Sequence, residues 1–151
     1  MTSIEKMDFL ISRVEEKLSS LNESDTTHSR LREVNLKSIR YLYNKLELSQ
    51  KHPDFSTIFD YSAMNLSGIG LKDGEFGKIR EGKYVQLIAI SYETDDEGER
   101  STRNYSLGYY GKAEKLNEKD KSTIIEFVLR WRYEKTFQHA EQYQKVLSEL
   151  F

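Results

Sequence analysis

The sequence predicts one α+β domain over residues 1–151, in which long helices combine with a small antiparallel sheet. Near both ends of the chain, apolar residues recur at every third or fourth position, which is the period of an amphipathic helix. In the middle of the chain this period disappears, and five of the eight glycines fall between Gly68 and Gly82. A run rich in β-forming residues follows directly. A chain of 151 residues has room for one modest hydrophobic core.

The first helix is predicted over residues 3–21. Thr2 and Glu5 have the spacing of a capping box, in which a hydroxyl accepts from a free backbone amide and a carboxylate lies at the positive end of the helix. The apolar stripe is as narrow as a coiled-coil seam, and such a seam needs one facing helix rather than a deep core. Its members are Ile4, Met7, Ile11, Val14, Leu18 and Leu21.

A second helix is predicted over residues 28–50, and Pro53 prevents its continuation. A short polar link joins it to the first helix, so residues 3–50 should form an antiparallel helical hairpin. The residues expected to point inward are Leu31, Val34, Ile39, Leu42 and Leu46.

Residues 53–83 are predicted to hold a short helix that begins at Pro53, followed by a glycine-rich loop. Residues 84–111 then predict a β-hairpin, with strands in YVQLIAISYE and STRNYSLGYYG around the polar turn TDDEGE. A two-stranded hairpin is marginally stable alone, so it should pack on the helices.

A long C-terminal helix is predicted over residues 117–150, with Asn117 as its N-cap. A continuous helix of this length extends ~50 Å, whereas a compact domain of this size is ~38 Å across. The helix should therefore overhang or break, and an overhanging apolar stripe needs a partner. The stripe consists of Ile125, Leu129, Tyr133, Phe137, Ala140, Tyr143, Leu147 and Leu150.

Composition excludes several classes of function. The chain has no cysteine, which removes disulfides, zinc–thiolate sites and thiol catalysis. The three histidines, His28, His52 and His139, show no ligand spacing, so we expect neither a metal site nor a cofactor. A net charge of −2 supplies no general basic field for nucleic acid. Neither a signal peptide nor a run of ~18 apolar residues is present, so we expect a cytoplasmic protein without membrane contact.

One motif resembles a phosphate-binding loop but lacks its chemistry. Gly77 to Lys83 reads G-x-x-x-x-G-K, and the next residue is Tyr84 rather than the small hydroxyl residue that holds magnesium. The segment also leads into a predicted strand, whereas a phosphate-binding loop leads into a helix. We therefore interpret it as a connection into the sheet.

Arg132 and His139 lie seven residues apart on the predicted C-terminal helix, hence on one side of it. This Arg-x6-His pattern, in RYEKTFQH, resembles the Arg-x(4–6)-His pattern of HEPN-type ribonucleases. The resemblance covers eight residues and lacks the Asn or Asp that commonly follows the arginine. It implies a metal-independent ribonuclease in a helical bundle, in which the histidine moves the proton of the 2′-hydroxyl and the arginine steadies the phosphate.

The predicted hairpin is rich in aromatic residues on alternating positions. Tyr84, Ile88 and Tyr92 are expected to share one face of the first strand. Aromatic rings beside arginine stack single-stranded bases in nucleic-acid-binding proteins. The same residues equally suit packing against helices or another protein. On the second strand the residues expected to share a face are Arg103, Tyr105, Leu107 and Tyr109.

These observations favour a non-enzymatic intracellular protein-binding module, such as a small regulator, inhibitor or immunity-type protein of a bacterium or phage. Its partner is expected to be another protein or a second copy of the chain. The alternatives are the ribonuclease with catalytic Arg132 and His139, and single-stranded nucleic-acid binding on the hairpin. The residues predicted to bind the partner are Arg103, Tyr105, Tyr109, Tyr110, Tyr143 and Leu147.

Overall fold

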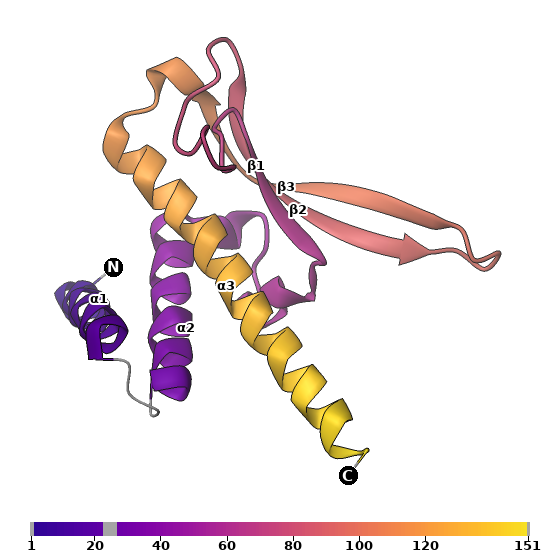
Figure 1. The fold of residues 1–151 in the computed structure, drawn as a ribbon. Helices are drawn as coiled ribbons and strands as arrows, with labels where there is room; N and C mark the ends of the chain where they lie inside the picture. Colours follow the sequence, from indigo (N-terminus) through magenta and orange to yellow (C-terminus); the bar gives the residue numbers. More distant parts are fainter. Residues whose placement is uncertain (1, 23–26, 151) are drawn as a thin grey trace.

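The computed structural model describes the backbone of residues 2–22 and 27–150 and the side chains of residues 2–15 and 28–150. It shows an α+β fold in which three long helices accompany a three-stranded antiparallel sheet (Figure 1). The long elements are α1 (Ser3–Asn22), α2 (Thr27–Lys45), β1 (Ala63–Ser67), β2 (Tyr84–Thr94), β3 (Arg100–Lys112) and α3 (Glu118–Ser148). The predicted fold class, helical hairpin, β-hairpin and C-terminal helix are confirmed.

The sheet contains one strand more than the two-stranded hairpin that the sequence predicts. The predicted short helix is present as the 3₁₀ helix η2 (Phe55–Asp60), which begins two residues after Pro53, and the chain then enters β1 rather than continuing as a loop. β1 pairs with β2 from Ala63↔Ile90 to Ser67↔Gln86, and the strand order is β1-β2-β3. AMNLS has little intrinsic β-propensity, so pairing with β2 and packing of Met64 decide its conformation.

α2 ends at Lys45, before the predicted boundary at residue 50. Glu47 has a backbone φ of 55°, which lies in the left-handed region and stops an α-helix. The chain continues as a 3₁₀ turn, η1 (Leu48–Gln50), whose Leu48 is fully buried.

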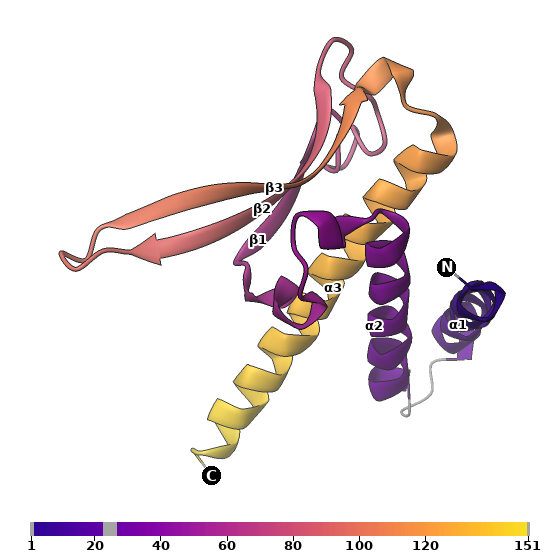
Figure 2. The same cartoon turned by 180° about the vertical axis from the view of Figure 1, so that it is seen from behind.

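α3 is a continuous helix of 31 residues, which corresponds to a rod of ~46 Å. The Oδ1 atom of Asn117 accepts a hydrogen bond from the backbone N–H of Asp120 at 2.8 Å, which confirms the predicted cap. α3 contacts both α2 and β1, and its C-terminal end extends beyond the rest of the fold (Figures 1 and 2). Residues 141–150 are all exposed, so the predicted overhang is confirmed.

One hydrophobic cluster connects the elements. Trp131 of α3 is 2 % exposed and donates its indole N–H to the carbonyl oxygen of Ile58 at 2.9 Å. Buried polar contacts also fix the orientation of α2 relative to α3. Arg32 of α2 donates two hydrogen bonds of 3.0 Å to the carboxylate of buried Glu134 in α3. The cluster includes Phe9, Ile39, Leu42, Met64, Leu87, Leu107 and Phe127.

The glycine-rich loop forms a compact turn against the sheet rather than a phosphate-binding loop. An isolated bridge joins Ile69 to Ile79, and the backbone N–H of Gly77 donates to the carbonyl oxygen of Gly70. A Cβ atom on Gly70 would lie 2.3 Å from the carbonyl oxygen of Glu75, so this close approach requires glycine. Lys83 leads directly into β2, as the sequence predicts.

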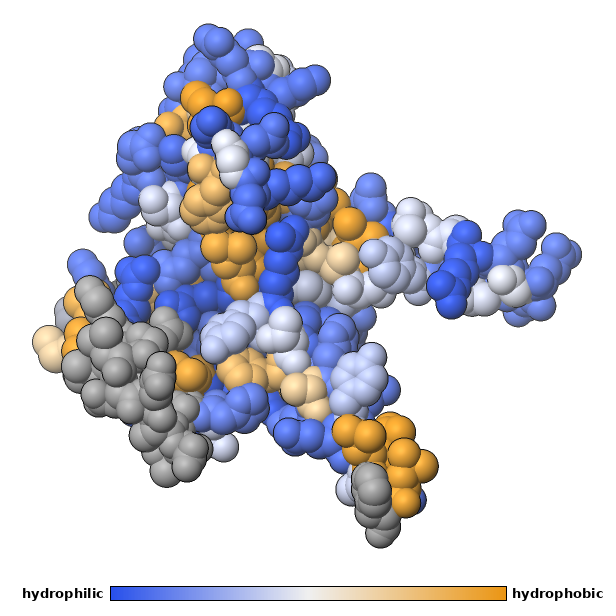
Figure 3. All heavy atoms as spheres, viewed as in Figure 1, coloured by the Kyte–Doolittle hydropathy of each residue, from blue (hydrophilic) through white to orange (hydrophobic). Residues whose placement is uncertain are grey.

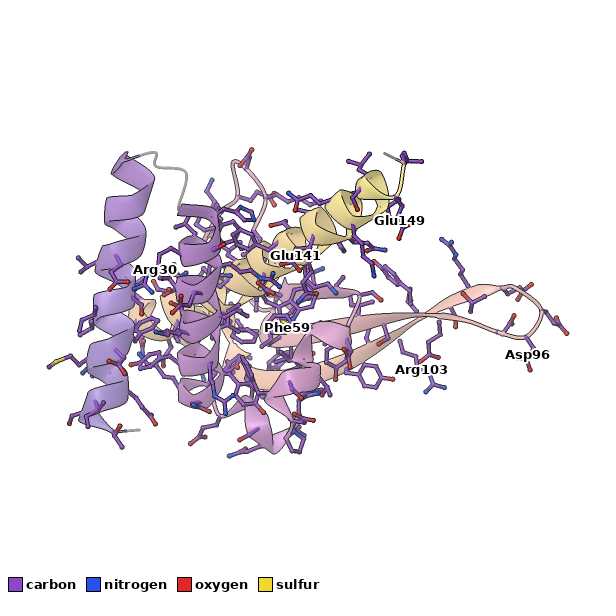
Figure 4. All side chains as sticks on the ribbon, turned by 90° about the horizontal axis from the view of Figure 1, so that it is seen from below. Arg30, Phe59, Asp96, Arg103, Glu141 and Glu149 are labelled. Carbon is purple, nitrogen blue, oxygen red and sulfur yellow. The ribbon has the colours of Figure 1, made fainter. Side chains whose placement is uncertain are left out.

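The outer half of the hairpin leaves the body of the protein as a two-stranded arm (Figures 1 and 2). β1 pairs with β2 only between residues 86 and 90, so residues 91–104 have no third strand beside them. All side chains from Tyr92 to Ser106 are exposed. Asp96 marks the tip and Arg103 the middle of this arm in Figure 4.

Candidate functional site

The apolar stripe of α1 faces solvent instead of α2. We define the α1 stripe as Ile4, Met7, Ile11 and Val14, whose exposed fractions range from 49 % to 74 %. α1 packs on α2 through Phe9, on the opposite side of the helix, and the Phe9 ring stacks on that of Tyr41 at 3.9 Å. The expectation that the adjacent helix α2 covers the α1 stripe was therefore wrong. The Phe9 ring offers α2 a larger planar contact surface than the aliphatic side chains of the α1 stripe do. Leu18 and Leu21 lie outside the described side chains.

A second apolar surface follows α3. We define the α3 stripe as Leu129, Tyr133, Tyr143 and Leu147, which share one side of the helix through spacings of four and fourteen residues, together with Leu150 two residues beyond the end of α3. Leu129 and Tyr133 are partly covered, with exposed fractions of 38 % and 40 %. Beyond them the exposed fractions rise to 72 % for Tyr143, 53 % for Leu147 and 74 % for Leu150.

The first half of the α3 stripe lies in a groove of about 1100 Å³. Leu31 of α2, Phe76 of the glycine-rich loop and Arg13 of α1 complete its walls. In Figure 3 apolar residues gather along this hollow between α1 and α3, and again at the free end of α3. Phe76 is 54 % exposed, and no periodic pattern in the sequence identifies it.

Charged residues at the groove are already engaged with each other. Arg13 of α1 and Arg130 of α3 each contact the carboxylate of Glu126 at 2.7 Å. The side-chain amide of Asn35 donates to the carbonyl oxygen of Arg130 at 2.9 Å. These contacts connect the three helices. The apolar side chains are therefore the part of the groove that a partner could cover.

The structure divides the predicted tyrosine surface of the hairpin between two faces. Tyr105 lies opposite Ala89 and Tyr109 opposite Gln86, and residues opposite one another on antiparallel strands share a face. Gln86 and Ala89 are three residues apart on β2, and side chains separated by an odd number of positions on a strand point to different sides. The predicted common face of Arg103, Tyr105, Leu107 and Tyr109 is therefore wrong. The register shift between Leu87 and Ile88 adds one residue to β3 between Tyr105 and Tyr109, and this reverses the alternation.

The tyrosines consequently have different surroundings. Tyr105 is 38 % exposed and contacts the ring of Tyr61, whereas Tyr109 is 57 % exposed and lies 5.8 Å from the ring of Tyr84. Tyr110 packs against the core, and its hydroxyl oxygen is buried. Burial raises the pKa of Tyr110 to about 12. Tyr110 therefore contributes to the core rather than to an exposed surface.

Arg103 lies on the exposed arm and forms a cross-strand ion pair of 3.3 Å with Glu93. A hydrogen bond to Tyr105 and the carboxylate of Glu93 raise the pKa of the Arg103 guanidinium. The turn beside it carries Asp95, Asp96 and Glu97. An acidic tip repels nucleic-acid phosphates, so the outer arm does not add to the stacking hypothesis.

Arg132 and His139 line one cleft of about 380 Å³ between β1, β2 and α3. Arg132 donates from Nε and Nη2 to the carbonyl oxygen of Met64, at 3.1 and 2.9 Å, and so braces β1 against α3. Burial lowers the pKa of this guanidinium. His139 is exposed and forms no hydrogen bond within the part of the chain that the structure describes. The cleft thus unites the two residues, with the arginine also committed to a structural contact.

No protein-family model, curated protein or solved structure matches this chain. Among the described residues, no three His, Asp or Glu side chains are grouped closely enough to hold a metal ion. None of the described helices combines the length and the apolar character needed to cross a membrane.

Proposed function

We propose that this protein is a non-enzymatic intracellular protein-binding module, such as a small regulator, inhibitor or immunity-type protein. The observation that carries the proposal is the α3 stripe, which continues past the fold with no other described element covering it. Burial of a leucine side chain contributes about 1.5–3 kcal/mol. Covering Tyr143, Leu147 and Leu150 would therefore stabilise a complex by several kcal/mol before the cost of association.

The groove and the overhang suit a helical partner. An amphipathic helix that follows α3 would contact Leu129 and Tyr133 in the groove and Tyr143 and Leu147 beyond it, which is the helix-in-groove mode of recognition. The exposed α1 stripe offers a second surface of the same kind. A second copy of the chain can supply such a helix as well as another protein can.

A charge substitution on the stripe tests the proposal. The tagged chain is captured from its native cell, and the co-purifying protein is quantified beside the oligomeric state measured by sedimentation velocity. Leu147→Glu should abolish the association, because it places a carboxylate in an apolar interface. Ser148→Glu is the matched control, since it adds the same charge to the next exposed position, away from the stripe. Equal association of both folded variants would refute the role of the α3 stripe.

The second candidate is the metal-independent ribonuclease, and its support is the cleft shared by Arg132 and His139. The measurement is cleavage of a mixed-sequence RNA in EDTA. Under this alternative His139→Ala removes the activity without changing the fold, because the histidine is exposed. Under the protein-binding proposal, wild type and variant are equally inactive and associate equally well. Arg132→Ala is less informative, since it also removes the brace on Met64.

A further inference from the structure

The cleft that contains Arg132 and His139 is lined by cationic and neutral side chains only. Its walls come from β1, β2 and α3, and they include no Asp or Glu. Elsewhere in the described chain, arginines such as Arg13, Arg30 and Arg32 each have a carboxylate beside them. The polar residues that matter here are Asn65, Tyr92, Arg132, Lys135 and His139.

Three of these residues form a row on α3. Arg132, Lys135 and His139 follow each other at spacings of three and four, so they project from one side of the helix. This side faces β1 and β2, and it adjoins the groove of the α3 stripe, which Arg132 also lines. The floor is formed by Met64 and Trp131, which are almost fully buried.

Several hydrogen-bond donors in the cleft have no acceptor among the described residues. Arg132 uses Nε and Nη2 on Met64, and its Nη1 makes no hydrogen bond with the described residues. Lys135 uses one ammonium proton, for the carbonyl oxygen of Phe59 at 2.9 Å, which leaves two. Figure 4 labels Phe59, the residue that supplies this carbonyl oxygen. The Oδ1 atom of Asn65 accepts from the backbone N–H of Leu66, so its amide NH₂ remains free to donate.

A site with several free donors, positive charge and no carboxylate favours an anion. Burial lowers the pKa of Arg132, because desolvation disfavours its charged form, and a bound anion would offset this cost. Two fixed cations and a histidine match the charge of a phosphomonoester better than that of a carboxylate. The cleft volume lies within the ~300–1,000 Å³ range of small-molecule sites, and the exposed ring of Tyr92 adds an apolar surface beside the polar row.

We propose that this cleft binds a small phosphate-bearing molecule, with Arg132, Lys135, His139 and Asn65 around the phosphate. The site can be tested separately from the protein-binding proposal, because Lys135 and His139 line this cleft and not the groove, although Arg132 lines both. Leu147→Glu should leave phosphate binding intact, and His139→Gln should leave protein association intact. Failure of one proposal is therefore distinguishable from failure of the other.

Isothermal titration calorimetry with adenosine 5′-monophosphate tests the site, with adenosine as the uncharged probe and inorganic phosphate as the isolated anion. Wild type should bind the monophosphate at least tenfold more tightly than adenosine. His139→Gln and Lys135→Gln should each weaken that binding about tenfold, whereas Lys135→Arg should retain it. Lys145→Gln is the control, because it removes the same charge from an exposed position of α3 outside the cleft.

His139→Gln keeps the test valid if Lys135→Gln does not fold, since the histidine is exposed and makes no hydrogen bond with the described residues. Equal binding of adenosine and its monophosphate would overturn the proposal, as would monophosphate binding that neither variant weakens. A third arm uses a 12-nucleotide RNA. Binding of this RNA alone, with neither small phosphate probe bound, would also overturn the proposal. It would instead support the ribonuclease hypothesis for this cleft.

Discussion

The two halves of α3 have the same apolar period and very different surroundings. Residues 118–137 place Ile124, Phe127 and Trp131 in the core, each at most 2 % exposed. Residues 138–148 carry Tyr143 and Leu147, which lie in line with Leu129, roughly opposite those buried residues, and are mostly exposed. An apolar period thus identifies a helix and an apolar side of it, but it does not say whether the chain itself covers that side.

The largest effect should come from the buried half. Phe127→Ala removes a fully buried ring from the central cluster, so we expect the free energy of unfolding to fall by about 3–5 kcal/mol. Urea denaturation followed by circular dichroism measures the change. A loss below about 1 kcal/mol would show that α3 does not anchor the core.

The next effect concerns the polar tie between α3 and α2. Glu134→Ala leaves Arg32 without its buried carboxylate partner, and loss of one member of a buried pair typically costs about 3–5 kcal/mol. We expect about 2–3 kcal/mol here, because a quarter of the Arg32 side chain is exposed and it retains Glu141. Glu141→Ala, at an exposed position (Figure 4), is the control and should cost far less. Equal losses in the two variants would contradict the role of burial.

A third change extends the comparison to the sheet. The buried hydroxyl of Tyr110 has no hydrogen-bond partner among the described residues. Tyr110→Phe should therefore raise the free energy of unfolding by about 1 kcal/mol at pH 7.

The same residue predicts a pH dependence. Burial raises the folded-state pKa of Tyr110 from 10.0 to about 12, so the neutral phenol is favoured in the folded protein. The associated stability is complete below pH 10 and declines as the pH rises through 12. Stability profiles between pH 8 and 12 should fall less steeply for Tyr110→Phe than for wild type. Parallel profiles would mean that the phenol is solvated in the folded state.

The smallest effect is expected in the overhanging half. Leu147→Ala should change the free energy of unfolding by less than about 0.5 kcal/mol, because Leu147 is half exposed and lies beyond the core. The same change should weaken association with the proposed partner. A large loss of stability in the isolated, monomeric chain would show that α3 folds back on itself in solution.

Local patterns determined most of the elements. The caps at Thr2 and Asn117 and the uninterrupted periods predict α1 and α3 to within two residues of their ends, because helix formation depends on neighbours three and four positions away. The β-forming run and its polar turn predict β2 and β3 for the same reason. The length of α3 predicted that it would either overhang or break, and the structure shows the overhang.

Only the tertiary structure decided which surfaces are covered. β1 exists because β2 offers an edge, the α1 stripe is exposed because Phe9 provides the better contact with α2, and added residues in β3 separate Tyr105 from Tyr109. The cleft likewise depends on Met64 and Arg132, which are distant in sequence. The sequence by itself determined the helices and the hairpin, since these arise from local spacing. Their coverage arises from competition among distant side chains for the same surface, and no local pattern encodes that outcome.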